Sequence, residues 1–420
     1  MFRQTFVYLS SSIISGLLPF FLLPILTRFI SAEEYGKISM FLIFMGLLNA
    51  IVGLSVHGAS ARRYFDKNIS KERLAIYNGN CLVILLATFI VSLLLVKLFG
   101  NVISSLLSIS EVWLYYATFC VFFSFLLTFR LVQWQVRENA YKYGFTQILN
   151  SFITFILTVM FVVHFEAGAD GRVFALLITS FLLGLLSVFS LYRSDLVSFS
   201  LKKEDIKDAV RFGAPLIPHV CGGFLLMSFD RYIINQELGL AYAGMYMVLV
   251  NLGNAINMLF NSMNRAYTPW LFSRLKKDDL STNKIIVKYT YIFFLLLIIF
   301  SIINFKISDV VYELFTGADY HSVSHLLPVV IQGQIFFGMY LVVTNYLFYM
   351  RKTKYVSLVT ILSGFINVVL VFAFIKDLGL QGVAYAFLIS SAFRFVLTWA
   401  LSAKFYSMPW LNFYNFGNMK

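Results

Sequence analysis

The stretch from Phe212 to Tyr246 reads F-G-A-P-L-I-P-H-V-C-G-G-F-L-L-M-S-F-D-R-Y-I-I-N-Q-E-L-G-L-A-Y-A-G-M-Y. It follows a basic, charge-rich linker and is apolar between Arg211 and Arg231. The 20 residues that separate these two arginines correspond to ~30 Å of α-helix, which is the thickness of the hydrocarbon core of a bilayer. We therefore expect a membrane-crossing helix here, and Pro215 and Pro218 in its first turns favour a bend near its start.

The composition extends this conclusion to the whole chain. Hydrophobic residues make up 60% of the 420 residues and charged residues only 13%, against ~25% charged in soluble globular proteins. A run of about 25 apolar residues follows Met1-Phe2-Arg3-Gln4, which is longer than the core of a signal peptide. We expect a multi-pass membrane protein whose first apolar run is retained as a span.

Apolar segments of spanning length recur along the chain and predict an all-α protein with twelve transmembrane helices. Most of the 33 lysines and arginines fall in alternate loops and at the two ends of the chain. Because cytoplasmic loops carry the excess of basic residues, this alternation predicts that both termini are cytoplasmic, and it explains the net charge of +13 without nucleic acid. The predicted spans are 5–28, 38–58, 77–99, 111–133, 144–164, 172–192, 212–230, 242–263, 285–305, 325–349, 355–375 and 381–403.

The two halves of the chain resemble each other. The segment G-R-V-F-A-L-L-I-T-S from Gly171 to Ser180 is similar to G-V-A-Y-A-F-L-I-S-S from Gly382 to Ser391. The end of the first span, around Arg28, is likewise similar to the end of the seventh, around Arg231. Transporters are commonly built from such repeats. We predict two six-helix bundles around a central cavity, an N-terminal lobe of residues 1–200 and a C-terminal lobe of residues 201–420.

Asparagines form a stripe along the predicted eighth span. At ~100° per residue, their spacings of three and four place them within an arc of ~140° on the helix. One interpretation is hydrogen bonding between helices. The other interpretation, which we favour, is that the stripe forms a wall of a water-filled lumen and that its amides bind sugar hydroxyls. The stripe consists of Asn251, Asn254, Asn257, Asn261 and Asn264.

Arginines within or beside the spans are candidate anion ligands. Arg394 is ten residues from Lys404 and is therefore expected near the middle of the membrane, where a charge needs a cavity or a partner. Arg28 and Arg231 mark equivalent ends of their spans. Arg62 and Arg63 follow the second span on the predicted cytoplasmic side, where guanidinium groups match the geometry of a phosphate. For Arg28 and Arg231, an interfacial anchor is the alternative.

Titratable groups that could couple transport to an ion gradient are few. All 20 acidic residues are predicted to lie in loops or at the ends of spans. Asp230, His57 and His219 are the candidates for ion coupling, although a lone histidine is more often packed or hydrogen-bonded. Three cysteines, Cys81, Cys120 and Cys221, lie in apolar spans without a metal-binding spacing. No metal, disulfide or cofactor is expected.

Sequence signatures of catalysis are absent. The chain contains no G-x-x-x-x-G-K-[ST], G-x-G-x-x-G, H-E-x-x-H or G-x-S-x-G motif. We therefore expect that it is not an enzyme and does not hydrolyse ATP.

Several motifs together resemble those of the polysaccharide transporters in the multidrug/oligosaccharidyl-lipid/polysaccharide exporter superfamily. They are the L-T-R-F-I-S-A-E-E-Y-G ending of span 1, R-R-Y-F after span 2, F-G-A-P-L-I-P at the start of span 7, and D-R-Y-I-I at its end. Within that branch, the chain is similar over nearly its whole length to Wzx-type flippases of O-antigen or capsule repeat units.

This resemblance implies a function and a substrate. The substrate would be an undecaprenyl-pyrophosphate-linked oligosaccharide, moved by alternating access from the cytoplasmic to the periplasmic leaflet of the bacterial inner membrane. Its pyrophosphate would bind arginines of the lumen. The arginines in the matching motifs of this sequence are Arg28, Arg231, Arg62 and Arg63, whereas the assignment of Arg394 is based only on its predicted depth in the membrane. Expected partners are this lipid-linked substrate, membrane lipids and other membrane proteins of polysaccharide assembly, and not nucleic acid.

Two other functions are open at this point. A multidrug cation antiporter of the same superfamily would need a carboxylate inside the membrane, and the sequence places none there. A polysaccharide polymerase or acyltransferase would need catalytic residues in a sizeable loop, and the predicted loops are short.

Overall fold

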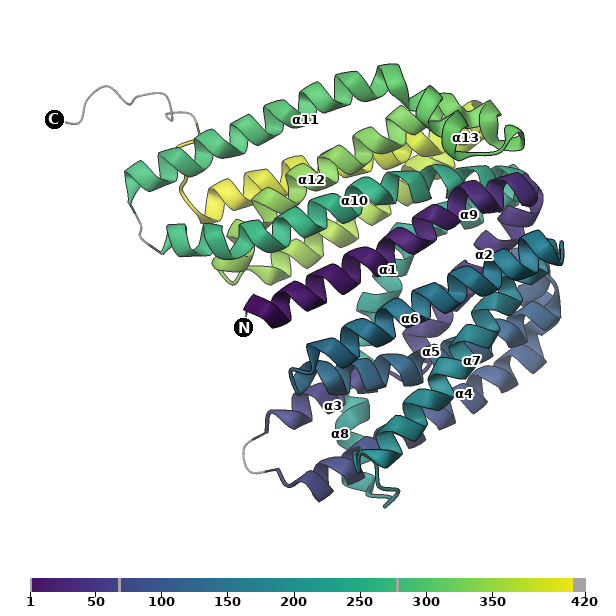
Figure 1. The fold of residues 1–420 in the computed structure, drawn as a ribbon. Helices are drawn as coiled ribbons and strands as arrows, with labels where there is room; N and C mark the ends of the chain where they lie inside the picture. The colour runs from purple at the N-terminus through teal and green to yellow at the C-terminus, as the bar shows by residue number, and fades with distance from the viewer. Residues whose placement is uncertain (1, 67–68, 277–278, 411–420) are drawn as a thin grey trace. The chain divides into compact units, whose positions relative to one another are not determined.

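The computed structural model describes residues 2–66, 69–276 and 279–410, without the side chains of residues 2, 3, 5, 6, 9, 218, 219 and 221–227. Every regular element in this part of the chain is a helix (Figure 1). The chain forms two compact units, residues 1–247 and 248–420, which are described one at a time below. The predicted lobe boundary at residue 200 stays a prediction.

The first unit contains nine α-helices, counted over the described residues, and the start of a tenth. Its helices α5 and α7 pack together, as do α1 and α6, which are far apart in the sequence. The helices are α1 (Phe2–Phe29), α2 (Ala32–Ile51), α3 (Val56–Tyr64), α4 (Lys71–Leu107), α5 (Glu111–Val136), α6 (Ala140–Val159), the π-helical η1 (Met160–His164), α7 (Gly168–Arg193), α8 (Lys203–Gly213), the 3₁₀ turn η2 (Ala214–Leu216) and α9 (Ile217–Glu237).

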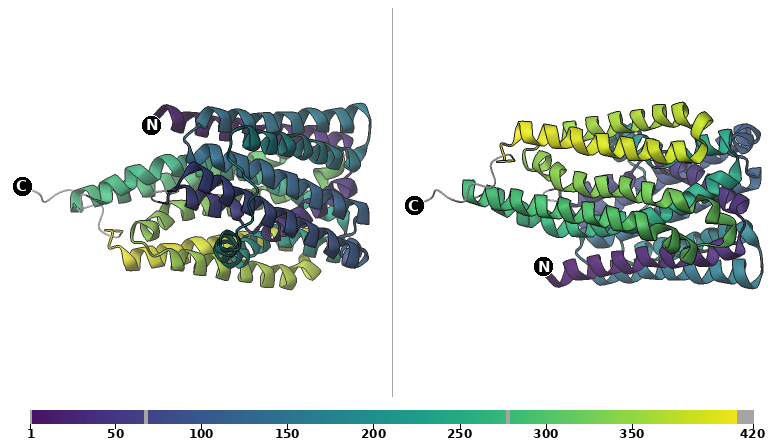
Figure 2. Two further views of the ribbon diagram at one scale, coloured as in Figure 1. Left: turned by 90° about the horizontal axis from the view of Figure 1, so that it is seen from below. Right: turned by 90° about the horizontal axis from the view of Figure 1, so that it is seen from above.

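The second unit is built from long helices that run alongside one another (Figure 2). Both α13 and α11 pack against α12. The elements are α10 (Leu240–Leu275), whose first turns belong to the first unit, α11 (Leu280–Phe315), the 3₁₀ segment η3 (Ala318–Leu326), α12 (Leu327–Tyr349) and α13 (Thr353–Phe405).

The helices account for the twelve predicted spans. Ten helices among the described residues are long and apolar enough to cross a bilayer. One of them, α13, has 53 residues and would be ~80 Å long if straight, more than twice the hydrocarbon core. It is interrupted at Gly379, where φ is 57° and ψ is −136°. α13 therefore contains two spans, and α9, with 21 residues, is long enough to be the twelfth.

The two halves of α13 lie side by side as an antiparallel pair. The Ser390 hydroxyl of the second half donates a hydrogen bond of 3.1 Å to Oδ1 of Asn367 in the first. Both residues are buried. The positive φ at Gly379 is costly for a residue with a Cβ atom, so glycine suits the turn between the predicted spans 355–375 and 381–403.

The second predicted span is not one continuous helix. The sequence predicts a helix over 38–58, but α2 ends at Ile51 and α3 begins at Val56. Gly53, Leu54 and Ser55 between them all have positive φ, from 45° to 78°. Thr88 of α4 accepts a hydrogen bond of 2.9 Å from the Gly53 amide, which stabilises the break. Apolar periodicity cannot reveal this break, because its apolar residues continue the pattern of the span.

The basic linker before α9 is partly helical. α8 carries charged residues on one side, and the buried Asp205 accepts hydrogen bonds of 2.5 and 2.6 Å from the two terminal nitrogens of Arg73 in α4. The proline positions are as predicted: Pro215 lies at the start of η2 and Pro218 at the start of α9.

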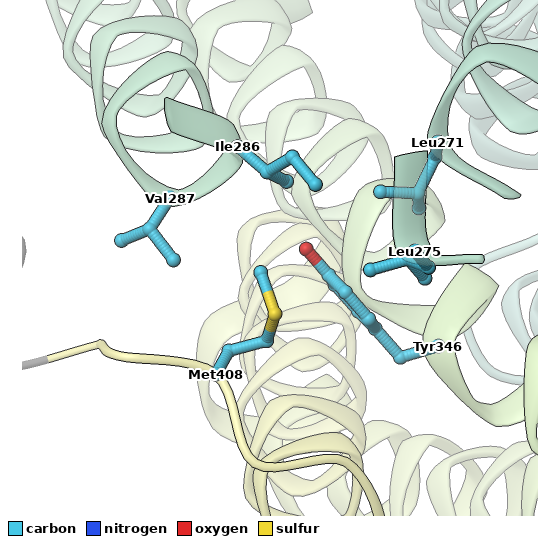
Figure 3. Packing of buried hydrophobic residues seen from close by; sticks show 6 residues of the cluster. All are labelled: Leu271, Leu275, Ile286, Val287, Tyr346 and Met408. Carbon is cyan, nitrogen blue, oxygen red and sulfur yellow. The ribbon is translucent and has the colours of Figure 1, made fainter. Parts of the chain in front are cut away.

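One end of the second unit is closed by an apolar core (Figure 3). Leu271 and Leu275 of α10 pack with Ile286 and Val287 of α11. Tyr346 of α12 lies between them, and Met408, which follows α13, covers the cluster. This core joins four segments and fixes the ends of α10 and α12 relative to each other.

The similar segments of the two halves occupy equivalent places. Gly171 lies near the start of α7, and a Cβ atom there would be 3.0 Å from the backbone carbon of Phe161. Gly382 lies near the start of the second half of α13, and a Cβ atom there would be 2.6 Å from the carbonyl oxygen of Phe374. In both halves a glycine thus lets the last helix pack closely on the end of the preceding one, and the duplication itself stays a prediction.

Candidate functional site

Arg394, in the middle of a membrane helix, lies against a pair of neighbouring aromatic rings. Its guanidinium carbon is 5.0 Å from the ring centre of Phe337 and 4.7 Å from that of Tyr340, both in α12. Among the described residues it forms no salt bridge, and its buried Nε has no hydrogen-bond partner. Ring faces attract a cation without neutralising it, so Arg394 is available to an anion.

The asparagine stripe of α10 is hydrogen-bonded to α12 over part of its length. Asn257 donates a hydrogen bond of 3.1 Å to Gln334, and Asn345 donates one of 2.8 Å to Asn264. Asn261 donates to the backbone and side-chain oxygens of Asn257. The bonds to Gln334 and from Asn345 are those of the interhelical interpretation, whereas the bonds from Asn261 stay within α10.

The N-terminal part of the stripe, Asn251 and Asn254, differs from the part that is hydrogen-bonded to α12. Asn254 is exposed and Asn251 is half-buried. The lumen interpretation therefore stays a prediction, and it applies best to Asn254.

A cavity of about 500 Å³ opens within the second unit beside Asn264, at the C-terminal end of the stripe. Asn264 and Arg274 line it together with the rings of Tyr267, Trp270 and Tyr289. Arg274 lies 5.5 Å from the ring centre of Trp270. Rings beside an amide and a cation form a surface suited to a sugar or its phosphate. Neither Arg274 nor these rings stood out in the sequence, because one polar residue among aromatic residues has no distinctive spacing.

Asp230 and Arg231 form a buried pair in α9. The Asp230 side chain is 8% exposed and lies 3.7 Å from Nε of Arg231. It also accepts hydrogen bonds from the Arg231 amide, at 2.8 Å, and from the Tyr246 hydroxyl.

The sequence placed Asp230 at the end of its span, and this stays a prediction. The helix α9 itself continues for seven more residues, to Glu237. Asp230 is thus a buried carboxylate inside a helix.

The remaining candidates are dispersed. His57 lies at the start of α3, 5.2 Å from the ring centre of Phe125, directly after the break in the second span. Arg28 is exposed near the end of α1. The side chains of His219 and Cys221 lie outside the described residues, whereas Cys81 and Cys120 are buried free thiols.

Arg62 and Arg63 already have carboxylate partners. Arg62 donates to Asp208 of α8 at 2.5 Å, and Arg63 donates to Asp66 at 2.6 Å. Burial alone would raise the pKa of Asp208, but hydrogen bonds from Tyr77 and Arg62 outweigh that effect and lower it. Asp208 is therefore ionised at neutral pH. The assignment of Arg62 and Arg63 to pyrophosphate stays a prediction, and it requires the ligand to compete with these carboxylates.

A sequence model of a family described as polysaccharide biosynthesis protein matches residues 1–276. The chain belongs to this family. The resemblance predicted from the span-end motifs is thereby confirmed.

Two proteins of Haemophilus influenzae are similar to this family member over most of its length. A protein of the Lsg locus is 26% identical over 88% of this chain and 90% of its own. A second, described as an uncharacterized membrane protein, is 26% identical over 87% of this chain and 88% of its own.

Solved structures of multidrug resistance transporters show the same fold. An inward-facing MATE family transporter of the MOP superfamily has a TM-score of 0.72 with 16% identity, covering 96% of this chain and 94% of that one. An outward-facing MATE structure has a TM-score of 0.60, also with 16% identity. The protein is thus a multi-pass membrane protein of a polysaccharide biosynthesis family with the MATE fold.

The two interpretations of the asparagine stripe are distinguishable by cysteine labelling. Cys at Asn254 is expected to react with a small water-soluble thiol reagent about tenfold faster than Cys at the buried Leu252, because only a wetted position supports rapid reaction. Cys at Asn257 should react more slowly than at Asn254, since that position faces Gln334. Rates are measured in membranes, with reagent added from each side in turn.

The controls for this experiment lie on other faces of the same helix. Cys at Ala255 and at Leu259, which lie at other angles on the helix, should be protected. Equal inertness of all five stripe positions from both sides would establish the stripe as interhelical hydrogen bonding and remove the sugar-contact proposal.

Proposed function

We propose that the protein is a flippase for undecaprenyl-pyrophosphate-linked oligosaccharide repeat units of O-antigen or capsule. It moves them from the cytoplasmic to the periplasmic leaflet of the inner membrane by alternating access, with both termini in the cytoplasm. The family supports a role in polysaccharide biosynthesis, and the fold is one that solved transporters adopt.

The observation that carries this proposal is Arg394. A cation held in a membrane helix without a carboxylate is costly, and the cost is offset when an anionic substrate binds it. A pyrophosphate supplies such an anion, and guanidinium groups bind phosphate oxygens in a bidentate manner. Arg28, Arg231, Arg62 and Arg63 are proposed to contact the same group at other stages of transport. The exposed part of the asparagine stripe is proposed to contact the glycan.

Asp230 is the proposed site of ion coupling. Its burial beside Arg231 and Tyr246 makes its charge sensitive to its surroundings. A gradient of H⁺ or Na⁺ would act there, with His57 and His219 as further candidates.

A second candidate function, export of cationic drugs, is favoured by the same buried carboxylate. Arg231 opposes it, because this arginine neutralises the carboxylate and repels a cation.

Reconstitution into liposomes tests both proposals. The substrate is a lipid-linked oligosaccharide with a labelled sugar, and its arrival in the outer leaflet is measured by digestion with an added glycosidase. We expect the protein to accelerate arrival, and an imposed H⁺ or Na⁺ gradient to increase the rate in the wild type but not in Asp230→Asn. Efflux of a cationic dye without glycan transfer would instead establish the drug exporter.

A gradient effect that survives Asp230→Asn together with loss of both histidines would exclude the proposed coupling site. Full transport without any gradient would favour the alternative, in which consumption of the product on the far side drives the flux.

A further inference from the structure

A second cavity lies entirely within the first unit, and neither Arg28 nor Arg231 lines it. Its volume is about 1160 Å³. Its walls are the start of α4, the end of α5, the start of α6 and the segment 194–198 after α7. The Lys/Arg distribution places all of these ends on the cytoplasmic side. We call this cavity the basic cleft and define it by Arg130, Arg137, Lys71, Lys142, Trp134 and Tyr64.

The four cations of the basic cleft form no salt bridge in the part of the chain that the structure describes. Lys71 interacts electrostatically with its neighbour Glu72. Three carboxylates also line the cleft, Asp66, Glu72 and Asp195. Asp66 is neutralised by Arg63, at 2.6 Å. The cleft therefore retains more positive than negative charge.

Arg130 is held by neutral groups only. Its side chain is 4% exposed, and it donates hydrogen bonds of 3.0 Å to the hydroxyls of Ser190 and Ser194. Its guanidinium carbon lies 4.4 Å from the ring centre of Trp134. A buried guanidinium without a carboxylate has a favourable free energy of interaction with an incoming anion, because no internal pair has to be broken.

Arg137 repeats this arrangement seven residues, or about two helical turns, further along the chain. It donates to the backbone and side-chain oxygens of Gln133, at 3.0 and 2.6 Å, and lies 4.9 Å from the ring centre of Tyr64. Two guanidinium groups thus stack on two aromatic rings in one cleft. Phosphate oxygens suit the guanidinium groups, and a sugar ring suits an aromatic edge or face beside them.

The wall opposite α5 is fixed in place. Asn78 donates to the carbonyl of Leu196 at 2.8 Å, and Asn80 donates to that of Ser200 at 2.9 Å. At Gly79, a Cβ atom would be 2.1 Å from the carbonyl oxygen of Ser198, so the segment lies directly on α4. The basic cleft is therefore preformed, and binding does not have to order this wall.

We propose that the basic cleft binds a phosphorylated sugar. Arg130, Arg137 and Lys142 hold its phosphate groups, and Trp134 and Tyr64 contact its sugar. The proposal deepens the proposed function and rests on it for the side of the membrane: the cleft would receive the headgroup of the substrate before translocation. The same chemistry is presented by a membrane-anchored diphosphate sugar and by a soluble nucleotide sugar, and the experiment separates these two sources.

Binding is measured on the full-length protein in lipid nanodiscs by the change in tryptophan fluorescence. One series adds undecaprenyl-diphosphate-N-acetylglucosamine to the nanodiscs, and the other adds UDP-N-acetylglucosamine to the solution. Saturable binding is expected in the first series. Binding in the second series alone would assign the cleft to a soluble donor. Trp134→Phe should remove most of the signal, because Trp134 is the tryptophan in the cleft.

The variants test the cations directly. Lys142→Gln, at an exposed position, and Arg137→Gln are each expected to raise the Kd about tenfold, since each removes a charge-assisted hydrogen bond. The Arg130→Gln variant should also raise the Kd about tenfold if the protein folds. The conclusion depends on the Arg137→Gln and Lys142→Gln variants. Arg211→Gln is the matched control: an exposed arginine of α8 outside the cleft, whose loss should leave the Kd unchanged.

Two results would overturn the proposal. The first is an unchanged Kd in the Arg137→Gln, Lys142→Gln double variant with an unchanged unfolding temperature. The second is equal binding of phosphatidylglycerol, which would show that no sugar is recognised. If the wild type transfers glycan but the variants bind the ligand as the wild type does, the proposal for the basic cleft is refuted and the proposed flippase function stands. Binding without any glycan transfer would leave the cleft intact and refute the flippase.

Discussion

Replacing Arg394 with glutamine is expected to slow glycan transfer about 100-fold or more, because a diphosphate that leaves the aqueous interface must meet a fixed cation in a medium of low dielectric constant. Arg394→Lys should recover only part of the rate, since a point charge lacks the bidentate geometry of a guanidinium. The rate is measured by the glycosidase assay in liposomes. Surface polysaccharide in cells that carry only the variant gives a second measurement.

The control has to separate binding from packing, because Arg394 stacks on Phe337 and Tyr340. Lys404→Gln changes an exposed lysine of the same helix and should transfer glycan normally. A packing role predicts that Phe337→Leu reduces transfer as strongly as Arg394→Gln and lowers the unfolding temperature equally. Normal transfer by Arg394→Gln would refute the assignment of this residue to the pyrophosphate.

Asp205→Ala is expected to destabilise the protein by about 2–4 kcal/mol, because it leaves the Arg73 guanidinium without its buried partner. The Asp205 side chain is 4% exposed and that of Arg73 is 30% exposed. The expected loss of stability is therefore smaller than for a fully buried ion pair. The free energy of unfolding is measured in mixed detergent micelles.

A double-mutant cycle isolates this interaction. Arg73→Ala together with Asp205→Ala should be less destabilising than the sum of the single changes. Glu33→Ala serves as the matched control: its salt bridge to Lys37 is solvent-exposed, so its loss should cost at most ~1 kcal/mol. Additive single effects would show that the Asp205–Arg73 contact contributes little to the attachment of α8 to α4.

The sequence predicted the spans well because membrane insertion acts on contiguous apolar runs. The turn at Gly379, where the backbone is not helical, falls between predicted spans eleven and twelve. The prolines of the seventh span lie at helix starts, as expected. The break after Ile51 was missed, because the hydrogen bond between Gly53 and Thr88 that stabilises it joins residues 35 positions apart.

The candidate site was predicted less completely. The sequence singled out Arg394 by depth and the asparagine stripe by spacing, since both are properties of one helix. It did not identify the rings of Phe337 and Tyr340, the amides of Gln334 and Asn345 that hydrogen-bond the stripe, or the partner of Arg62 at Asp208. It also gave no indication that Arg130 hydrogen-bonds to Ser190 and Ser194.

By itself, the sequence determined that this is a multi-pass helical membrane protein, how many times it crosses, and which family it resembles. These properties depend on the free energy of transferring local segments into lipid and on short motifs. The tertiary structure alone decided which cations are neutralised and which remain available. Arg62 and Arg63 meet carboxylates, whereas Arg130 and Arg394 meet hydroxyls and rings. The electrostatic free energy of a charge depends on the groups within a few ångströms of it, and most of those groups lie on helices that are distant in the sequence.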